Sequence, residues 1–193
     1  MQSKNFQLDL ANANEDVRRL YESAFPKEEQ IPWKDLMCLM KTMSLDFTVY
    51  YEDCDGFADD ESAASSSRLL GLTIVYPRKQ FNWFWYFAVP EELRGKGIGQ
   101  RILTQLIEKY KGQSNILDME SPEQVCENSE QRKRRHAFYL RNGFRDTGVG
   151  KSFKGIDYTI MMIGEGTFTQ CDYDLIIDEL RSYWDAMPSD ENR

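Results

Sequence analysis

The sequence predicts a mixed α+β fold, in which helices cover both faces of a mostly antiparallel sheet that contains one parallel pair of strands. Alternating apolar and polar residues indicate several strands, and apolar residues three and four positions apart indicate helices between them. In the middle of the chain a strand, a glycine-rich turn, a helix and another strand follow one another, which is a right-handed parallel crossover. With 193 residues, the chain is near the usual size of one domain, and we predict a single domain over residues 1–193.

The N-terminal part begins with a predicted strand and two helices. Residues 6–10 alternate as a short strand, residues 17–25 have an apolar face at helical spacing, and a second short helix begins near Pro32. Residues 47–51 and 70–74 then alternate as the two strands of a hairpin.

The loop of this hairpin, about residues 53–67, is acidic and rich in serine. Its fragment Asp53–Gly56 has part of a calcium-loop pattern, but the third Asp before the glycine and the Glu six positions after it are missing. We therefore predict a solvated loop that binds no metal.

The crossover occupies the centre of the chain. Residues 81–89 are strongly apolar and aromatic on both faces, which favours a central strand covered on both sides. Apolar residues at helical spacing from Ile98 to Tyr110 predict the crossover helix, and residues 115–120 the second strand.

The C-terminal third predicts two helices around a pair of antiparallel strands. A long basic helix ends at Gly143, and residues 144–149 and 158–163 read as the strands. An extra helix over about residues 172–187 has an apolar stripe, so it covers either a face of the sheet or a second subunit. A homodimer is thus left open.

Composition argues against several classes of protein. The formal net charge of -8 argues against general affinity for nucleic acid, whose phosphates bind clustered Lys and Arg. The chain shows neither an apolar targeting segment nor an uncharged apolar run near the roughly 20 residues that span a bilayer, so we expect a cytoplasmic protein that binds no membrane. The 4 cysteines lie far apart without a CxxC pair, which suggests neither a zinc site nor disulfides.

Basic residues nevertheless gather in two places. One group surrounds the central glycines (Arg94, Lys96 and Arg101), and the other follows the long helix (Arg132, Lys133, Arg134, Arg135, Arg141 and Arg145). In an acidic protein these groups predict binding of a small polyanion, and a solvated helix face is the alternative.

The glycine turn is the most informative segment. Gly95, Gly97 and Gly99 let a ligand approach the backbone without interference from a Cβ, and a helix N-terminus follows that suits a pyrophosphate. The turn lacks the Ser or Thr that follows Gly-Lys in the mononucleotide pattern, and Gln100 stands where the dinucleotide pattern requires glycine. Both of those readings therefore fail.

The chain resembles the GNAT superfamily of N-acetyltransferases. Arg94, Gly97 and Gly99 match the acyl-CoA motif of that family, and residues 138–144 (FYLRNGF) are similar to its Phe-Tyr-x-x-x-Gly-Phe segment. The order of elements over about residues 6–163 resembles the family's fold. One position departs from the family's pattern, because Arg132 stands where the long helix often carries Asn, and Asn128 lies farther upstream.

The resemblance implies acetyl-CoA as co-substrate, with no metal. The cofactor-binding residues that it implies are Phe87, Ala88, Val89, Arg94, Gly95, Lys96, Gly97, Ile98, Gly99, Gln100, Asn128 and Tyr139. In addition, a backbone N–H between Phe87 and Val89 can stabilise the charge that gathers on the thioester oxygen.

The resemblance also implies two catalytic residues. Tyr139 corresponds to a tyrosine near the CoA sulfur, where its hydroxyl can protonate the leaving thiolate, and the alternative is a core tyrosine. Glu120, at the end of the strand after the crossover, is the expected base that removes a proton from the amine. Asp118 shares its parity along the strand and is the second candidate, and a surface Glu120 is the alternative.

Two further features carry weaker hypotheses. His136 is the only histidine and lies three positions before Tyr139, where it can face the same side of the helix. The aromatic block Trp83–Tyr86 can enclose a cationic acceptor, but a core strand is the favoured interpretation.

We therefore expect an enzyme that passes the acetyl group of acetyl-CoA to a primary amine of a small molecule or peptide, by direct attack in a ternary complex. Two alternatives use the same fold without transfer. The first is a sensor that binds CoA, and the second is an interaction protein that pairs through its C-terminal helix.

Overall fold

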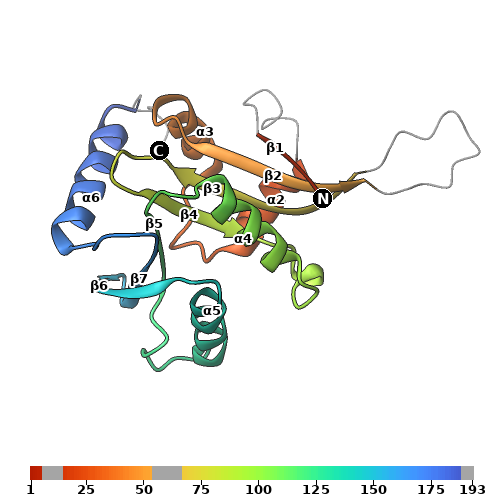
Figure 1. Cartoon of the computed structure of the whole chain (residues 1–193). Coiled ribbons are helices and arrows are strands. Elements are labelled where there is room, and N and C mark those ends of the chain that lie inside the picture. Colours follow the sequence, from red (N-terminus) through yellow and green to blue (C-terminus); the bar gives the residue numbers. More distant parts are fainter. Residues whose placement is uncertain (6–14, 54–66, 188–193) are drawn as a thin grey trace, which may run out of the picture.

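One seven-stranded sheet organises the protein, in the order β1-β2-β3-β4-β5-β7-β6 (Figure 1). The computed structural model describes residues 1–5, 15–53 and 67–187. The strands are β1 (Gln2–Asn5), β2 (Asp46–Asp53), β3 (Ser67–Tyr76), β4 (Asn82–Ala88), β5 (Asn115–Glu120), β6 (Arg145–Phe153) and β7 (Ile156–Ile163). All neighbours pair antiparallel except β4 and β5, so the predicted fold class is confirmed.

Helices cover both faces of the sheet, as predicted. They are α2 (Glu15–Ala24), α3 (Trp33–Thr42), α4 (Ile98–Lys109), α5 (Ser129–Arg141) and α6 (Gln170–Asp185), with a short 3-10 turn η1 (Glu91–Leu93) before α4. The cores formed by α2, α3 and α6 contain Leu72, Ile74 and Ile116, whereas the cores under α4 and α5 contain Val75 and Leu117. Because adjacent residues of a strand point to opposite faces, α4 and α5 lie on the face opposite α2, α3 and α6.

The predicted elements that fall on described residues are all present. The strand expected over residues 6–10 lies outside the described part, and the described first strand is Gln2–Asn5, which pairs with β2. Residues 54–66 of the predicted acidic loop are also outside it. The strand expected over residues 144–149 continues to Phe153.

The C-terminal helix α6 packs on the sheet of its own chain. Ile176 is buried in the core with Trp83 and Ile116, and Leu180 packs against the same cluster. Arg78, next to the end of β3, is tied to Glu179 by two hydrogen bonds. Of the two alternatives for this helix, the structure therefore shows that it covers a sheet face.

The two parallel strands diverge along their length. β4 and β5 pair only at Asn82↔Asn115 and Trp83↔Ile116, although β5 pairs with β7 over all its residues. At the paired end, the Asn82 side chain donates to the side chain of Asn115 at 2.9 Å. Beyond Trp83 the sheet therefore opens between its two central strands.

A bulge in β4 decides which aromatic side chains face this opening. Ile74 pairs with Tyr86 and Val75 with Phe84, so Trp85 is an extra residue without a partner on β3. An extra residue interrupts the alternation of faces. As a result Trp83, Trp85 and Tyr86 all stack on the face covered by α2, α3 and α6.

Candidate active site

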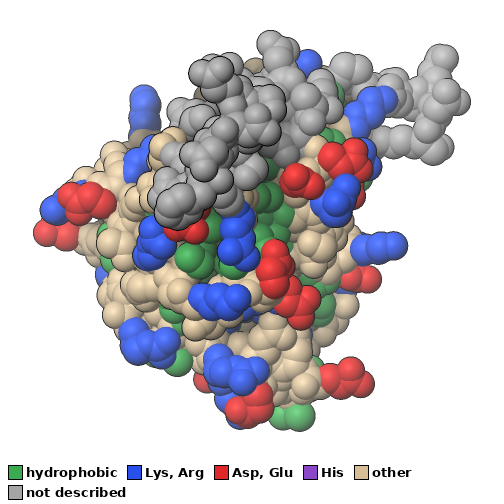
Figure 2. Space-filling model, turned by 90° about the vertical axis from the view of Figure 1, so that its right-hand side faces the viewer, with side chains coloured by type: hydrophobic (Ala, Val, Ile, Leu, Met, Phe, Trp, Pro, Cys, Tyr) green, Lys and Arg blue, Asp and Glu red, His purple; other side chains and the backbone are tan. Residues whose placement is uncertain are grey.

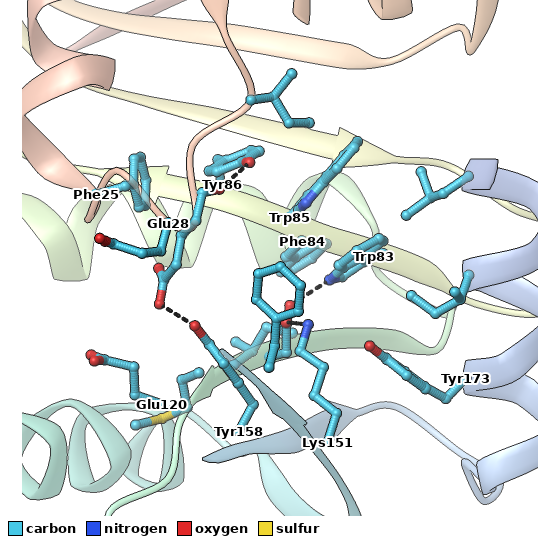
Figure 3. A pocket seen from close by; sticks show the side chains of 18 of the residues that line it. Phe25, Glu28, Trp83, Phe84, Trp85, Tyr86, Glu120, Lys151, Tyr158 and Tyr173 are labelled. Carbon is cyan, nitrogen blue, oxygen red and sulfur yellow. Dashed lines mark hydrogen bonds and ion pairs between the residues drawn. The ribbon is translucent and has the colours of Figure 1, made fainter. Parts of the chain in front are cut away.

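A cavity of about 890 Å³ opens where β4 and β5 separate. Its walls come from Trp83–Phe87 of β4, Leu117–Glu120 of β5, Phe25 and Glu28–Pro32 before α3, the hairpin of β6 and β7, and one side of α6. Figure 3 shows Trp83 and Trp85 on one side of the space, and Lys151, Tyr158 and Glu120 on the other. The opening in the sheet thus becomes a hollow with aromatic and charged walls.

The glycine turn presents backbone N–H groups at the start of α4. Gly95 has φ 74° and Gly97, the N-cap of the helix, has φ 78°, a left-handed conformation that favours glycine. A Cβ on Gly97 would meet no atom within 4 Å. The space in front of the turn is open, and the first N–H groups of a helix have no partner within it, so these residues fit a pyrophosphate.

Basic side chains surround the glycine turn, and a second group of basic side chains lies on α5. Figure 2 shows the face at the right of Figure 1, where Lys and Arg side chains lie around exposed hydrophobic ones. Arg94, Lys96 and Arg101 are exposed, and Arg101 Nη1 lies 3.8 Å from Glu52 Oε1. On α5, Arg132 and Arg135 share Glu120, and Lys133 pairs with Glu130. Three members of the second predicted anion-binding group are therefore paired with two carboxylates of the protein.

Tyr139 reaches the cavity from α5. Its side chain is only 8 % exposed, packs against Phe138 and Phe144, and lines the cavity. Burial raises the pKa of Tyr139 to about 12, with a smaller lowering by Arg135. Among the described residues, its hydroxyl has no hydrogen-bond partner. Tyr139 is thus a protonated hydroxyl at neutral pH in the wall of the cavity.

Glu120 lies at the end of β5 with both carboxylate oxygens occupied. Arg132 Nη2 donates to Oε1 at 2.7 Å, and Arg135 Nη2 donates to Oε2 at 2.9 Å. The Glu120 and Arg132 side chains are buried, at 6 % and 5 % exposure. Two guanidinium groups occupy the two carboxylate oxygens, so a proton from an amine would have to displace one of them. The role of Glu120 as the base stays a prediction, and its contacts with Arg132 and Arg135 do not favour that role.

Asp118 is engaged in the same way. Trp83 Nε1 donates to Oδ1 at 2.9 Å, and Lys151 Nζ donates to Oδ2 at 2.6 Å. The Lys151 ammonium also lies over the rings of Tyr158 and Tyr173. Burial by itself would lower the pKa of Lys151, but Asp118, with a smaller contribution from Tyr173, raises that pKa. Lys151 is therefore a charged partner of Asp118.

Glu29 is a cavity residue that sequence reasoning missed. It lies between α2 and α3, and Tyr158 donates to its Oε1 at 2.6 Å. Burial raises the pKa of Glu29, the Tyr158 hydrogen bond lowers it, and the charge of Glu120 raises it again. No motif marks this position, and only the pairing of a loop with a strand 129 residues away brings the two side chains together.

The other predicted cofactor-binding residues lie at the end of β4 and at the starts of α4 and α5. Phe87 lines the cavity, Ala88 is buried beside it, and Val89 accepts a hydrogen bond from Arg94 Nε at 3.3 Å. Ile98 is buried in the core and can offer only its backbone. Asn128 is the N-cap residue of α5, and its Nδ2 lies 3.5 Å from Glu120 Oε1.

Two polar residues of the sequence predictions, Gln100 on α4 and His136 on α5, bind other side chains of the protein. Gln100 accepts a hydrogen bond from Asn142 Nδ2 at 3.1 Å, which ties the two helices together. His136 Nε2 lies 2.8 Å from Asp146 Oδ1 and does not line the cavity.

Among the described residues no group of His, Cys, Asp and Glu is arranged to hold a metal ion. No helix in the described ranges is long and apolar enough to cross a membrane.

Comparison with known proteins gives one family. The model of the acetyltransferase (GNAT) domain matches residues 47–146, and no curated protein matches the sequence. A GNAT-family acetyltransferase structure from Bacteroides thetaiotaomicron superposes with TM-score 0.71 at 20 % identity, covering 97 % of this chain and 100 % of that one. One from Desulfovibrio desulfuricans gives TM-score 0.54 at 19 % identity, covering 84 % and 96 %. An aminoglycoside 6'-N-acetyltransferase complexed with coenzyme A gives 0.55 at 16 % identity, with the same coverage.

Proposed function

The chain belongs to the GNAT family of acetyltransferases, and from this premise we propose that it transfers the acetyl group of acetyl-CoA to a primary amine. The acceptor is the amine of a small molecule or a peptide, and the transfer is a direct attack in a ternary complex. We further propose that the whole chain acts as one catalytic domain in the cytoplasm.

One observation carries the proposal, which is the opening between β4 and β5 with Tyr139 in its wall. The glycine turn and Tyr139 belong to the face of α4 and α5, whereas Trp83, Trp85 and Glu29 line the cavity from the other face. Two substrates can therefore reach the gap from opposite sides of the sheet. Such an arrangement suits transfer between two bound molecules without a covalent enzyme intermediate.

The protein's own groups have distinct roles in this proposal. Backbone N–H groups at Gly97 and the start of α4 bind the pyrophosphate, with help from Arg94 and Lys96. A backbone N–H at the end of β4 stabilises the charge on the thioester oxygen. Tyr139 then donates its proton to the sulfur as the carbon–sulfur bond breaks, which its raised pKa allows because the hydroxyl stays protonated at neutral pH.

The test is release of free thiol from acetyl-CoA with a panel of amines, peptides and aminoglycosides, with the acetylated product identified by mass spectrometry. We expect thiol release that depends on the amine and yields an N-acetyl product. Binding of acetyl-CoA without transfer to any amine would favour the CoA-binding sensor. An acetyl ester as the only product would keep the enzyme but reject the amine.

A further inference from the structure

Three carboxylates of the described chain act on one another at the open end of the sheet. Burial is the main cause of the raised pKa of Glu29, and the charges of Glu120 and Asp118 add to it. All three side chains line the same cavity. A carboxylate can accept the amine's proton, which has to be removed because a Lys-like amine has a pKa of about 10.4 and is protonated at neutral pH.

Glu29 differs from the other two in its free bonding capacity. Both oxygens of Asp118 and both oxygens of Glu120 accept hydrogen bonds from cationic groups or the indole of Trp83. At Glu29, Tyr158 donates to Oε1, and among the described residues no donor reaches Oε2. The carboxylate therefore keeps an oxygen that can bind an incoming N–H group.

The main chain at Glu29 is fixed as well. The Tyr86 hydroxyl of β4 donates to the Glu29 carbonyl at 2.9 Å, and the Glu29 N–H donates to the Pro26 carbonyl at 3.0 Å. Glu29 is thus held to β4 through its backbone and to β7 through its side chain. A base must lie within hydrogen-bond reach of its proton, and such bonds limit the positions that this carboxylate can take.

We propose that Glu29 binds the ammonium group of the acceptor and takes its proton, so that a neutral amine attacks the thioester. This inference rests on the proposed amine transfer and places the base outside the residues matched to the family, which are 47–146. Glu120 is then a structural partner of Arg132 and Arg135.

The proton balance of the step is complete with groups already named. The acceptor R-NH₃⁺ gives one proton to Glu29, its nitrogen bonds to the thioester carbon, and the carbon–sulfur bond breaks. Sulfur takes the proton of Tyr139, and the second proton lost by the nitrogen passes through water to restore Tyr139. Glu29 finally releases its proton to solvent, so one proton is released for each acetyl group transferred.

The surroundings of Glu29 give the direction of the expected pH dependence. The groups that face it are Tyr158 of β7, Asp118 and Glu120 of β5, Arg135 of α5, and Lys151 of β6 beside Asp118, with Glu28 exposed next to it. A carboxylate with a raised pKa loses its base function as the pH falls through that raised value. We therefore expect an acidic limb in kcat/KM that lies above the usual range for Glu.

The experiment compares Glu29→Gln, Glu120→Gln and the control Glu22→Gln, using the best acceptor from the thiol-release panel. We expect Glu29→Gln to lower kcat/KM by about 10²-fold or more and to remove the acidic limb, because a lost general base usually has this effect. Its affinity for CoA, measured by calorimetry, should stay unchanged. Glu22 is exposed on α2, pairs with Arg18 and does not line the cavity, so Glu22→Gln should retain the wild-type profile.

Tyr158→Phe supplies a readout that a merely structural role would not give. Its hydrogen bond to Glu29 lowers the pKa of that carboxyl, so its loss should raise the pKa and move the acidic limb to higher pH. Two acceptors with different amine pKa values should share this limb, since it belongs to the enzyme. A limb that follows each amine, or a folded Glu29→Gln with wild-type kcat/KM, overturns the proposal, as does loss of the limb in Glu120→Gln alone.

Carboxyl titration by NMR separates this inference from the proposed function. With ¹³C-labelled Glu side chains, we expect one carboxyl with a raised pKa that is missing in Glu29→Gln. If no amine is acetylated although this resonance is present, the proposed transfer fails while the carboxylate site stands. If amines are acetylated and the Glu29 resonance titrates in the usual range, the transfer stands and the assignment of Glu29 as a base with a raised pKa fails.

Discussion

The cavity has a proposed co-substrate side, with the glycine turn and Tyr139, and a proposed acceptor side, with Trp85 and Glu29. The two sides differ in how many of their residues lie within the family match. The glycine turn, α4 and Tyr139 lie within residues 47–146, which match the family model. On the acceptor side, Trp83, Trp85 and Glu120 also lie within that range, but Glu29, Lys151, Tyr158 and the wall supplied by α6 lie outside it. A common co-substrate requires a common backbone site, whereas the second substrate contacts side chains that each chain supplies from its flanking segments. This difference explains why a family match can indicate acetyl transfer without identifying the acceptor.

The largest effect should come from Tyr139, at the junction of the two sides. Tyr139→Phe removes the proton donor and keeps the packing, so kcat should fall by about 10²- to 10⁴-fold. The KM for acetyl-CoA should change little, because the proton is donated mainly in the transition state. Steady-state kinetics with the best acceptor test this, and wild-type turnover would make Tyr139 a packing residue.

Glu120 should affect stability on the acceptor side. In Glu120→Gln the buried guanidinium of Arg132 loses its anionic partner. Breaking a buried ion pair from one side usually costs several kcal/mol, and we expect the free energy of unfolding to fall by about 3 kcal/mol. Denaturant unfolding measures this free energy. The control is Glu130→Gln, which removes the carboxylate from an exposed ion pair with Lys133. Unchanged stability would show that the pair is not needed for folding.

The co-substrate side can be tested with two glycines at opposite ends of α4. Gly97 and Gly112 both have φ 78° and open space at the Cβ position, so valine at either one causes similar backbone strain. Only Gly97 borders the proposed pyrophosphate site. Gly97→Val should weaken CoA binding at least tenfold, which is about 1.4 kcal/mol, and Gly112→Val should not. Equal affinities in calorimetry would contradict the proposed site.

The smallest expected effect concerns the aromatic wall of the acceptor side. Trp85 is half-buried, stacks on Trp83 at 4.9 Å between ring centroids, and lines the cavity. Aromatic pairs contribute about 0.5–1.5 kcal/mol, so Trp85→Leu should raise the KM for an aryl-substituted amine about two- to tenfold. An aliphatic amine of equal length is the matched comparison. Equal changes for both amines would mean that the wall is only part of the core.

The sequence by itself determined the order of elements, the crossover and the glycine turn. These depend on local features, such as the spacing of apolar residues, the breaks at Pro90 and Gly112, and the conformational freedom of Gly97. The motif around Tyr139 also identified the family from the sequence. Tyr139 lies in the cavity wall because α5, the helix that carries it, packs beside the opening in the sheet.

Only the tertiary structure decided the acceptor side. The bulge at Trp85 turns a third aromatic side chain toward the cavity, which strict alternation along β4 does not predict. The pairing of Glu120 with Arg132 and Arg135, and that of Glu29 with Tyr158, join segments whose contacts no local pattern specifies. A carboxylate's availability as a base depends on which donors occupy its oxygens, and folding places those donors from distant parts of the chain.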